Sequence, residues 1–447
     1  LQFSSGTTGA KKGIEITSPV FFNQNDAYSN YLDFNNDSKV ITWLPHYHDM
    51  GLIACMLIPL VNNVPIVMMS PFEWVTNPKI LLQSITEIKP SHLWLPNFAL
   101  GHLSRSTDSE KIKNYDLSSL KLLVCCSEPL LEKTLNTFIN KFKSALLDPS
   151  IINNCYAMAE NTFAITSTSG GRIHFLDVDS LNDEQESSNA KTKYRSPPVA
   201  SAGKPLPNIS ISIMDEDGTE VQENGIGEIC IKSNCMLDRY HNNSEASKGC
   251  FQNDYFCTGD IGFFKDGELY VMGRQKDVII VAGENIYAYD IELALNEVDM
   301  LVPGRNVVFG IIDDGSDTER LVAVAETHQT MSFKVIESIK EDVFRKTNYI
   351  LSELVLVSHK ALKKGTAGKV SRDLNRKAYL AGDFQQDAQI HKKFSSNEDV
   401  LISLILNTFP HINIELLQDT ELFSSGLLDS LGFSRFIIEL ESHFQIK

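Results

Sequence analysis

Short apolar runs alternate with polar, helix-like stretches along the first part of the chain. Runs at residues 41–45, 64–69, 91–96 and 120–125 are almost wholly apolar, as strands buried on both faces are. The stretch 129–142 between such runs spaces its apolar residues as an amphipathic helix does. This alternation predicts an α/β fold with a layer of parallel strands flanked by helices.

A different pattern begins near residue 200, after a polar stretch at 182–198 that predicts an exposed loop. Strand-like runs separated by turn residues then continue to residue 273, and Asp266-Gly267 is typical of a hairpin turn. We therefore predict a large N-terminal domain over residues 1–273, whose part at about 200–273 is a β-rich subdomain.

The rest of the chain divides into three further segments. Two strand-like runs, a helical stretch at 332–345 and a strand at 354–357 predict a small α+β domain over residues 274–381. Residues 382–397 are polar and predict a linker. Residues 398–447 are acidic and amphipathic, which predicts part of an all-α helical bundle.

From the two ends of the sequence we predict that this chain is a fragment of a longer protein. The chain opens on Leu1, without Met, at a glycine-rich loop of a kind that normally follows a strand. The acidic helical segment stops at Lys447, before a bundle could close. We expect part of the large domain and part of the bundle to be missing.

Composition and charge exclude some functions. The 447 residues are 43% hydrophobic and 22% charged, as expected for a soluble globular protein of several domains. The net charge of -17 argues against general nucleic-acid binding, which needs a basic face. Prolines and asparagines interrupt the apolar stretch 50–69, so we expect no membrane span there.

The cysteines predict neither a zinc site nor a disulfide framework. Eight occur, two of them adjacent at Cys125 and Cys126, and no CxxC pair exists. We expect reduced core cysteines in a cytoplasmic protein.

A glycine-rich loop at residues 4–13 is the first candidate for chemistry. Its glycines let the backbone approach an anion, and successive N–H groups in such a turn form an anion-binding concavity. Its lysines add positive charge, but the spacing differs from that of the NTPase loop. Taken alone, the loop is either a phosphate site or an ordinary linker. The candidate ligands are Ser4, Ser5, Gly6, Thr7, Thr8, Gly9 and Lys12.

The loop resembles the signature of the adenylate-forming (AMP-binding) superfamily, which includes acyl-CoA ligases, peptide-synthetase adenylation domains and luciferases. Four further segments resemble the family's motifs in the family's order: YAMAE at 156–160, FCTGDIG at 256–262, the hinge segment at 273–292 and GTAGKVSR at 365–372. Five ordered motifs make this resemblance specific, and it covers nearly the whole chain.

The resemblance implies roles for the nucleotide-binding residues. Glu160 would hold Mg²⁺ through the phosphates of ATP, Asp260 would accept hydrogen bonds from the ribose, and Arg274 would contact ribose or phosphate. Tyr156 would stack near the adenine, whose pocket would be lined by Ser127, Glu128 and Pro129. Without the resemblance, Glu160 would be an acid on a helix surface and Asp260 would cap a turn. Arg274 would form a surface ion pair, and Tyr156 would be a core tyrosine.

Two lysines would control the reaction. Lys369 would be the catalytic residue, because one ammonium aimed at the α-phosphate stabilises the charge that develops in the transition state. Lys276 matches the family's hinge, where the small domain rotates after adenylation so that one site serves two half-reactions. Departures from the family's pattern include Ala157 in place of a usual glycine, along with Lys11, Lys363 and Ala367.

The identity of the acid is suggested by WLPHYHDMGL at 43–52, LPNFALGHL at 95–103 and the stretch 116–130, which look most like fatty acyl-AMP ligases. His48 would lie at the mouth of the acyl pocket. An amine contact from Asp49, as in an amino-acid adenylation domain, stays open. His46, His48 and Asp49 also suggest metal ligands, but the sequence supplies no further cluster to complete such a site.

The acceptor is suggested by LFSSGLLDSLGF at 422–433, which resembles an acyl-carrier domain. Ser430 would carry 4'-phosphopantetheine, attached by a phosphopantetheinyl transferase; the alternative is a plain helix N-cap. A flexible linker would keep the arm's thiol at high effective concentration.

We therefore expect an enzyme that uses ATP and Mg²⁺ to activate a carboxylic acid, namely a fatty acid, and loads it onto its own carrier for downstream synthase modules. The alternatives are an acyl-CoA ligase, an amino-acid adenylation module, or an inactive scaffold that only binds nucleotide.

Overall fold

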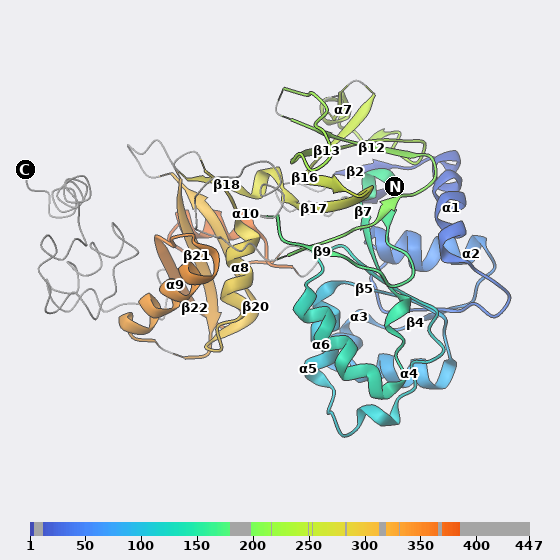
Figure 1. The fold of residues 1–447 in the computed structure, drawn as a ribbon, viewed down its shortest axis with the longest axis horizontal. Coiled ribbons are helices and arrows are strands. Elements are labelled where there is room, and N and C mark those ends of the chain that lie inside the picture. The colour runs from blue at the N-terminus through green and yellow to red at the C-terminus, as the bar shows by residue number, and fades with distance from the viewer. Residues whose placement is uncertain are drawn as a thin grey trace, which may run out of the picture. The chain divides into compact units, whose positions relative to one another are not determined.

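The computed structural model describes residues 1–3, 12–178, 198–215, 217–248, 250–252, 254–281, 284–312, 319–329, 331–364 and 369–384. The chain forms two compact units, Leu1–Lys276 and Asp277–Lys447. The division follows Lys276, slightly later than the boundary after residue 273 that the sequence suggested. Figure 1 shows the elements of both units.

A seven-stranded sheet forms the centre of the first unit, in the order β11-β8-β7-β6-β5-β3-β4. Five of its strands are parallel; the four apolar runs predicted four of them, β3 to β6, whereas β7 was not predicted. The five parallel strands are β3 (Val40–Thr42), β4 (Ile66–Met68), β5 (His92–Leu95), β6 (Leu122–Cys126) and β7 (Ile152–Ala157). The last two, β8 (Ala164–Ser167) and β11 (Lys204–Pro205), are antiparallel additions at one edge.

Helices connect the parallel strands, as a parallel sheet requires. The connecting helices are α2 (Ile58–Val61), α3 (Pro71–Thr76), α4 (Lys79–Ile88), α5 (Asn97–Ser106) and α6 (Glu132–Phe142), and α1 (Ser18–Leu32) precedes the first parallel strand. In Figure 1, α5 and α6 pack side by side next to the sheet. Helix α6 starts later than the expected residue 129. The reason is local: Ser127 is left-handed and Leu131 is extended, so the chain turns before the helix begins.

A second sheet in the first unit confirms the β-rich subdomain. Its path is β12 (Ile209–Met214), β13 (Gly227–Ser233), β16 (Tyr255–Lys265) and β15 (Phe251–Gln252), with β17 (Glu268–Arg274) paired to β16. The β16–β17 hairpin turns at Asp266 and Gly267, both with positive φ, as a type I′ turn requires.

Smaller pairings complete the first unit. Strands β1 (Gln2–Phe3), β2 (Gly13–Glu15) and β14 (Arg239–Tyr240) form a three-stranded sheet. Strands β9 (Phe175–Leu176) and β10 (Val199–Ala200) pair with each other, and α7 (Ser244–Lys248) follows β14.

The described part of the second unit has the α+β fold that the sequence predicted for residues 274–381. Strands β20 (Leu301–Ile311), β21 (Arg320–Thr327) and β22 (Glu353–Ser358) form its sheet, and β18 (Val278–Val281) pairs with β19 (Glu284–Tyr287). Its helices are α8 (Ala288–Asn296), α9 (Phe333–Thr347) and α10 (Arg372–Leu380).

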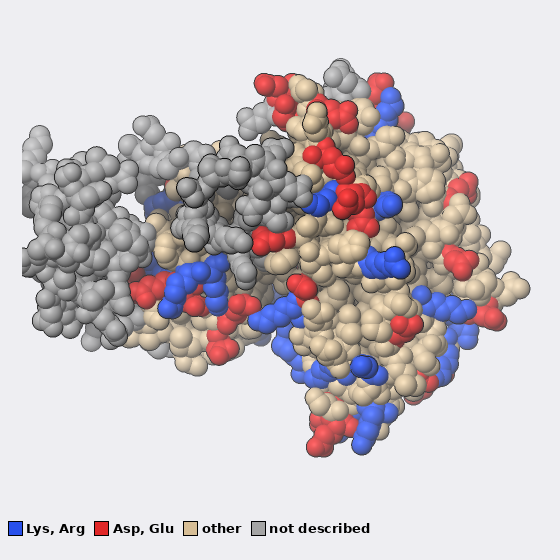
Figure 2. Space-filling model, in the orientation of Figure 1, with Lys and Arg blue, Asp and Glu red and all other residues tan. Residues whose placement is uncertain are grey.

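Several expectations lie outside the described residues. These are the linker and helical segment from residue 385 onward, including Ser430, the loop at 4–11 with Ser4, Ser5, Gly6, Thr7, Thr8 and Gly9, and residues 365–368. Within the described part of the chain, every helix is too short or too polar to cross a bilayer. On the face seen in Figure 2, acidic and basic side chains are interspersed.

Candidate active site

The candidate residues of the first unit gather at one edge of the parallel sheet. Strands β3, β5, β6 and β7 are parallel, so their carboxyl ends share that edge. The strand that follows β3 in sequence, β4, lies on one side of it and β5 lies on the other. Ligands of open α/β sheets bind outside the carboxyl ends at such a switch point.

Asp260 is the centre of the first polar cluster. The Tyr156 hydroxyl donates a hydrogen bond to Asp260 Oδ2 at 2.6 Å, and Arg274 Nε lies 3.3 Å from Asp260 Oδ1. Asp260 is buried and Arg274 is exposed. Burial and the nearby Asp260 carboxylate hold the pKa of Tyr156 well above its usual range, so this hydroxyl stays protonated and donates.

A bulge in β16 positions Asp260. Cys257 pairs with Cys230, and Ile261 pairs with Glu228, so Ile229 alone lies opposite three residues of β16. The three bulged residues are Thr258, Gly259 and Asp260. The sequence suggested a turn at the end of a strand here, but Asp260 lies inside β16 and pairs directly with Arg274 of β17.

Three hydrogen bonds hold this bulge. Gly259 N–H donates to Glu228 Oε1 at 2.8 Å, and Asp260 N–H donates to Thr258 Oγ1 at 3.0 Å. The Thr258 hydroxyl donates to the Ile229 carbonyl at 2.7 Å. Gly259 has φ +73°, a left-handed conformation that a side chain would strain. The Thr-Gly-Asp order therefore has a local physical reason.

Glu160 belongs to a second polar cluster. It lies in a short 3₁₀ turn, η5 (Ala159–Asn161), just after β7. The Tyr240 hydroxyl donates to Glu160 Oε1 at 3.0 Å, and Lys12 Nζ lies 4.5 Å from the centre of the Tyr240 ring. Tyr240 thus contacts both the acid and a lysine of the glycine-rich loop, through its hydroxyl and its ring face.

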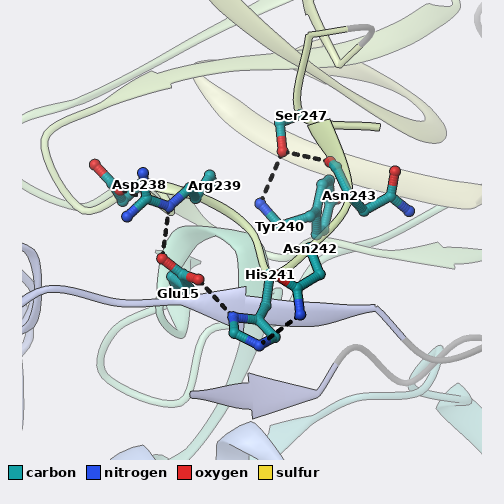
Figure 3. A network of polar contacts seen from close by, with 8 residues as sticks. All are labelled: Glu15, Asp238, Arg239, Tyr240, His241, Asn242, Asn243 and Ser247. Atoms are coloured by element: carbon teal, nitrogen blue, oxygen red, sulfur yellow. Dashed lines mark hydrogen bonds and ion pairs between the residues drawn. The ribbon is translucent and has the colours of Figure 1, made fainter. Parts of the chain in front are cut away.

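The segment that carries Tyr240 is fixed by its neighbours, as Figure 3 shows. Glu15 accepts hydrogen bonds from His241 Nδ1 and Arg239 Nε, both at 2.7 Å. These two contacts lower the pKa of the Glu15 carboxyl. The Tyr240 N–H donates to Ser247 Oγ at 3.0 Å. Strands β14 and β2 also pair here, so the backbone beside Lys12 and the backbone of Tyr240 are held together.

The expected adenine segment directly follows β6. Ser127 is exposed and has φ +71°, which is uncommon for a residue with a side chain and occurs often at functional sites. Glu128 Oε2 accepts the Phe98 N–H at 3.0 Å and so ties this segment to the residues after β5. Pro129 is exposed.

His48 is half-buried and immediately precedes an eight-residue π-helix, η1 (Met50–Leu57). Asp49 caps this helix, since its side chain accepts the Met50 N–H at 2.8 Å. One carboxylate oxygen of Asp49, which could otherwise have contacted a substrate amine, is therefore already hydrogen-bonded to the backbone. Gly51 allows the helix to lie against the end of β3, because a Cβ there would come within 2.3 Å of the Pro45 carbonyl oxygen.

An aromatic cluster lies after the same strands. The rings of Trp43 and Trp74 stack with centres 3.8 Å apart, and Phe98 packs edge-on against both. Both tryptophans are buried, whereas Phe98 is exposed. This end of the sheet is therefore apolar, unlike the clusters around Asp260 and Glu160.

The expected hinge lysine, Lys276, and the expected catalytic lysine, Lys369, lie outside these two polar clusters. Lys276 is exposed and is the last residue of the first unit, within the 3₁₀ turn η7 (Gln275–Asp277). Lys369 is exposed and belongs to the second unit, just before α10. Arg372, close to Lys369 in sequence, pairs with Asp277 at 2.6 Å and Glu292 at 2.7 Å. These ion pairs anchor the end of the lysine segment within the second unit.

The sequence did not identify three residues that this geometry makes important. Tyr240 and Glu228 contact Glu160 and Gly259 over a large sequence separation, so no local spacing could reveal them. Arg372 lies inside the GTAGKVSR motif, and its place in that motif could have identified it from the sequence. Ala157 lies in β7 and has no left-handed backbone, so its replacement of a usual glycine introduces no strain.

The residues present fit a magnesium-bound nucleotide. Mg²⁺ is usually bound by one or two carboxylates together with phosphate oxygens. Glu160 is half-buried and accepts the Tyr240 hydroxyl, and Lys12 Nζ lies over the face of the same ring. A carboxylate and an ammonium that contact one side chain suit a cation and the phosphates that it bridges.

Comparison with known proteins connects this geometry to a family. The family model described as AMP-binding enzyme matches residues 1–241. The medium-chain-fatty-acid–[acyl-carrier-protein] ligase JamA of Moorena producens is 29% identical over 406 residues, which cover 86% of this chain and 68% of JamA. The probable long-chain-fatty-acid–AMP ligase FadD30 of Mycobacterium tuberculosis is 29% identical over 428 residues, covering 87% and 71%.

Solved structures show the same fold. The fatty acid AMP ligase from Legionella pneumophila is 29% identical with a TM-score of 0.59, over 85% of this chain and 69% of that one. The structure of McyG A-PCP complexed with phenylalanyl-adenylate has a TM-score of 0.74 at 24% identity, over 100% of this chain and 69% of that one.

Proposed function

This chain belongs to the AMP-binding enzyme family, whose model matches more than half of it, and from that premise we propose how its residues activate and transfer an acid. The enzyme is an adenylate-forming acid–thiol ligase of the fatty acyl-AMP ligase type.

One observation carries the proposed mechanism: two polar clusters lie at the carboxyl end of β7. Tyr156, in β7, binds Asp260, and Glu160, in the turn after β7, binds Tyr240 beside Lys12. The first cluster offers a carboxylate acceptor to ribose hydroxyls. The second offers charge to the phosphates. A nucleotide that spans both would be held by its sugar and its phosphate chain.

The substrate carboxylate would attack the α-phosphorus, forming an acyl–phosphate bond while the bond to pyrophosphate breaks. Glu160 would hold Mg²⁺, which neutralises charge on the phosphates. Lys369 of the second unit would stabilise the charge that develops on the α-phosphate, and Lys12 would hold the departing phosphates.

A fatty acid is the proposed substrate. The exposed ring of Phe98 packs on the buried Trp43 and Trp74 and presents an apolar side chain at the sheet edge where His48 precedes η1. JamA and FadD30 are both named for fatty acids. Asp49, the alternative amine contact, already accepts a hydrogen bond from the backbone. These observations favour a fatty acid over an amino acid.

The proposed acceptor is the phosphopantetheine thiol on Ser430. JamA is named as an acyl-carrier-protein ligase, and the McyG A-PCP structure matches the full length of this chain. When attached by a phosphopantetheinyl transferase, the arm supplies a mobile thiol. Lys276 would act as the hinge between the two half-reactions, and downstream synthase modules would receive the acyl group. The eight cysteines are free thiols, which supports a reducing, cytoplasmic setting.

Pyrophosphate exchange with a panel of fatty, aromatic and amino acids tests the first half-reaction on the full chain. We expect exchange with fatty acids, and a loss of about a hundredfold or more in Lys369→Ala, since removing one transition-state charge contact costs that much. Lys363→Ala, an exposed lysine of the same unit, serves as the matched control. Unchanged exchange in Lys369→Ala would refute the catalytic role.

Intact-protein mass spectrometry tests the acceptor. After treatment with a phosphopantetheinyl transferase, fatty acid and ATP should add acyl mass to the chain, and Ser430→Ala should abolish this addition. Formation of free acyl-CoA without any loaded chain would contradict the carrier proposal and favour an acyl-CoA ligase.

A further inference from the structure

A cluster of two thiols and a carboxylate lies beside the β16 bulge and takes no part in the proposed reaction. Cys230 of β13 and Cys257 of β16 are directly opposite residues, with their sulfurs 3.6 Å apart. Glu228 lies two positions before Cys230, and side chains two apart on a strand share a face. The sulfurs and one carboxylate oxygen all lie within 4.8 Å of one another.

The spacing suits a soft metal ion. Zinc binds thiolates at about 2.3 Å, so two thiolates in tetrahedral geometry lie about 3.8 Å apart. The observed 3.6 Å is close to this separation. A carboxylate is a third ligand that zinc accepts, and the fourth position would take water. Among the described residues, this is the one group of three or more His, Cys, Asp or Glu side chains with such spacing.

The burial of the three side chains and the hydrogen bond that orients Glu228 also fit a metal site. Cys230 is buried, whereas Glu228 and Cys257 are half-buried, so the cluster combines a protected side with an open one. Glu228 Oε1 accepts the Gly259 N–H at 2.8 Å, which orients the carboxylate. An outer contact of this kind commonly fixes metal ligands. The carboxylate's second oxygen can serve a metal while this hydrogen bond persists.

We propose that Glu228, Cys230 and Cys257 form a binding site for one thiophilic divalent cation, such as Zn²⁺. The two thiols would lose their protons on binding, and the metal would bridge β13 and β16. Glu228 also holds the bulge that carries Asp260, so the bound ion would brace the strand that positions this residue.

Cobalt(II) titration of the reduced full-length protein under anaerobic conditions tests the site. One equivalent should produce thiolate-to-cobalt charge-transfer absorption together with the visible bands of a tetrahedral ion, and zinc should displace both. Cys230→Ser and Cys257→Ser should each remove the charge-transfer band of one thiolate and lower affinity at least about tenfold. Cys235→Ser, at a buried thiol of the same subdomain, should leave the spectrum unchanged.

Circular dichroism of each variant separates loss of the site from loss of the fold. A folded Cys230→Ser/Cys257→Ser double variant that retains the charge-transfer band would overturn the assignment. The same holds if the folded wild-type protein shows no thiolate band at saturating cobalt. Neither result depends on adenylation, so this test is independent of the proposed function.

Discussion

At the scale of the residue, Asp260 shows how side chains from distant strands define one position. Its carboxylate is buried and receives both the Tyr156 hydroxyl and the Arg274 guanidinium. Each contact comes from a different strand, and both survive only if the bulge keeps its geometry. The sequence identified all three residues through a family resemblance, but it could not show that they form one cluster.

Asp260→Asn should weaken nucleotide binding. The amide has no charge for Arg274 and is a weaker acceptor for ribose hydroxyls. A hydrogen bond to a charged group contributes about 1.5–3 kcal/mol, so KM for ATP in pyrophosphate exchange should rise about ten- to a hundredfold. Asp254→Asn, at a largely exposed acid near the same strand, should leave KM unchanged. An equal KM in both variants would contradict the ribose role.

At the scale of the element, the parallel sheet was predictable and the π-helix was not. Strands buried on both faces produce continuous apolar runs, and these located β3, β5 and β6 directly. The run at 64–69 also located β4, but this strand lies at the sheet edge and Met68 is exposed, so the prediction that it is buried was wrong. For the apolar stretch 50–69 the sequence predicted that no membrane span lies there, and its period did not indicate π geometry. The π-helix brings Gly51 against the Pro45 carbonyl, a contact that no periodicity could reveal.

Gly51→Ala should therefore destabilise the first unit. The added methyl would meet backbone atoms, which cannot move aside as a side chain can. We expect a loss of about 1–3 kcal/mol in unfolding free energy. Urea unfolding followed by tryptophan fluorescence measures it, since all three tryptophans, Trp43, Trp74 and Trp94, lie in this unit.

Gly101→Ala is the matched control. A methyl at this position in α5 would meet only the flexible end of Arg105. Alanine is also a better helix former than glycine, so stability should stay equal or rise by up to about 1 kcal/mol. Equal destabilisation by both variants would show that the contact at Pro45 is unimportant.

His92 of β5 should make the stability of the sheet depend on pH. Its ring is buried, with Nε2 2.8 Å from the Leu32 carbonyl and Nδ1 2.7 Å from Ser91 Oγ. Burial lowers the pKa of His92; the hydrogen bond to the Leu32 carbonyl partly opposes this, the charge of Lys121 lowers the pKa further and Asp33 raises it. The unfolded state therefore binds the proton at higher pH than the folded state does, so protonation favours unfolding.

This contribution is complete above the unfolded imidazole pKa of about 6.5 and is lost progressively as the pH falls below it. Between about pH 7.5 and about pH 5.5, wild-type stability should decrease more than that of His92→Gln. Urea unfolding at both pH values measures the difference. Equal decreases in the two proteins would show that other groups cause the acid sensitivity.

At the scale of the whole molecule, the order of domains was more predictable than the site. Changes in hydrophobic pattern located the large domain, its β-rich part and the α+β domain. The candidate site depends on contacts such as Tyr240 with Glu160, whose partners lie far apart in sequence. A pattern read along the chain contains no distances, so these contacts required the structure.

Lys276→Pro should separate the two half-reactions. Lys276 lies in a 3₁₀ turn, whose φ is close to the value that proline imposes. The substitution should preserve this conformation while restricting others. We expect pyrophosphate exchange within about threefold of wild type, but carrier loading slowed at least about tenfold. Lys276→Ala, which keeps backbone freedom, should retain both rates. Equal rates of loading in the two variants would contradict the hinge role.

The bulge in β16 also has a consequence for how this protein can evolve. Three residues of β16 face one residue of β13, and side chains alternate between the faces of a strand. Inserting or deleting one codon between Cys257 and Ile261 would turn every later side chain of the strand to the opposite face. We therefore expect this segment to tolerate substitutions but not insertions or deletions. Homologous genes should differ here in sequence and not in length.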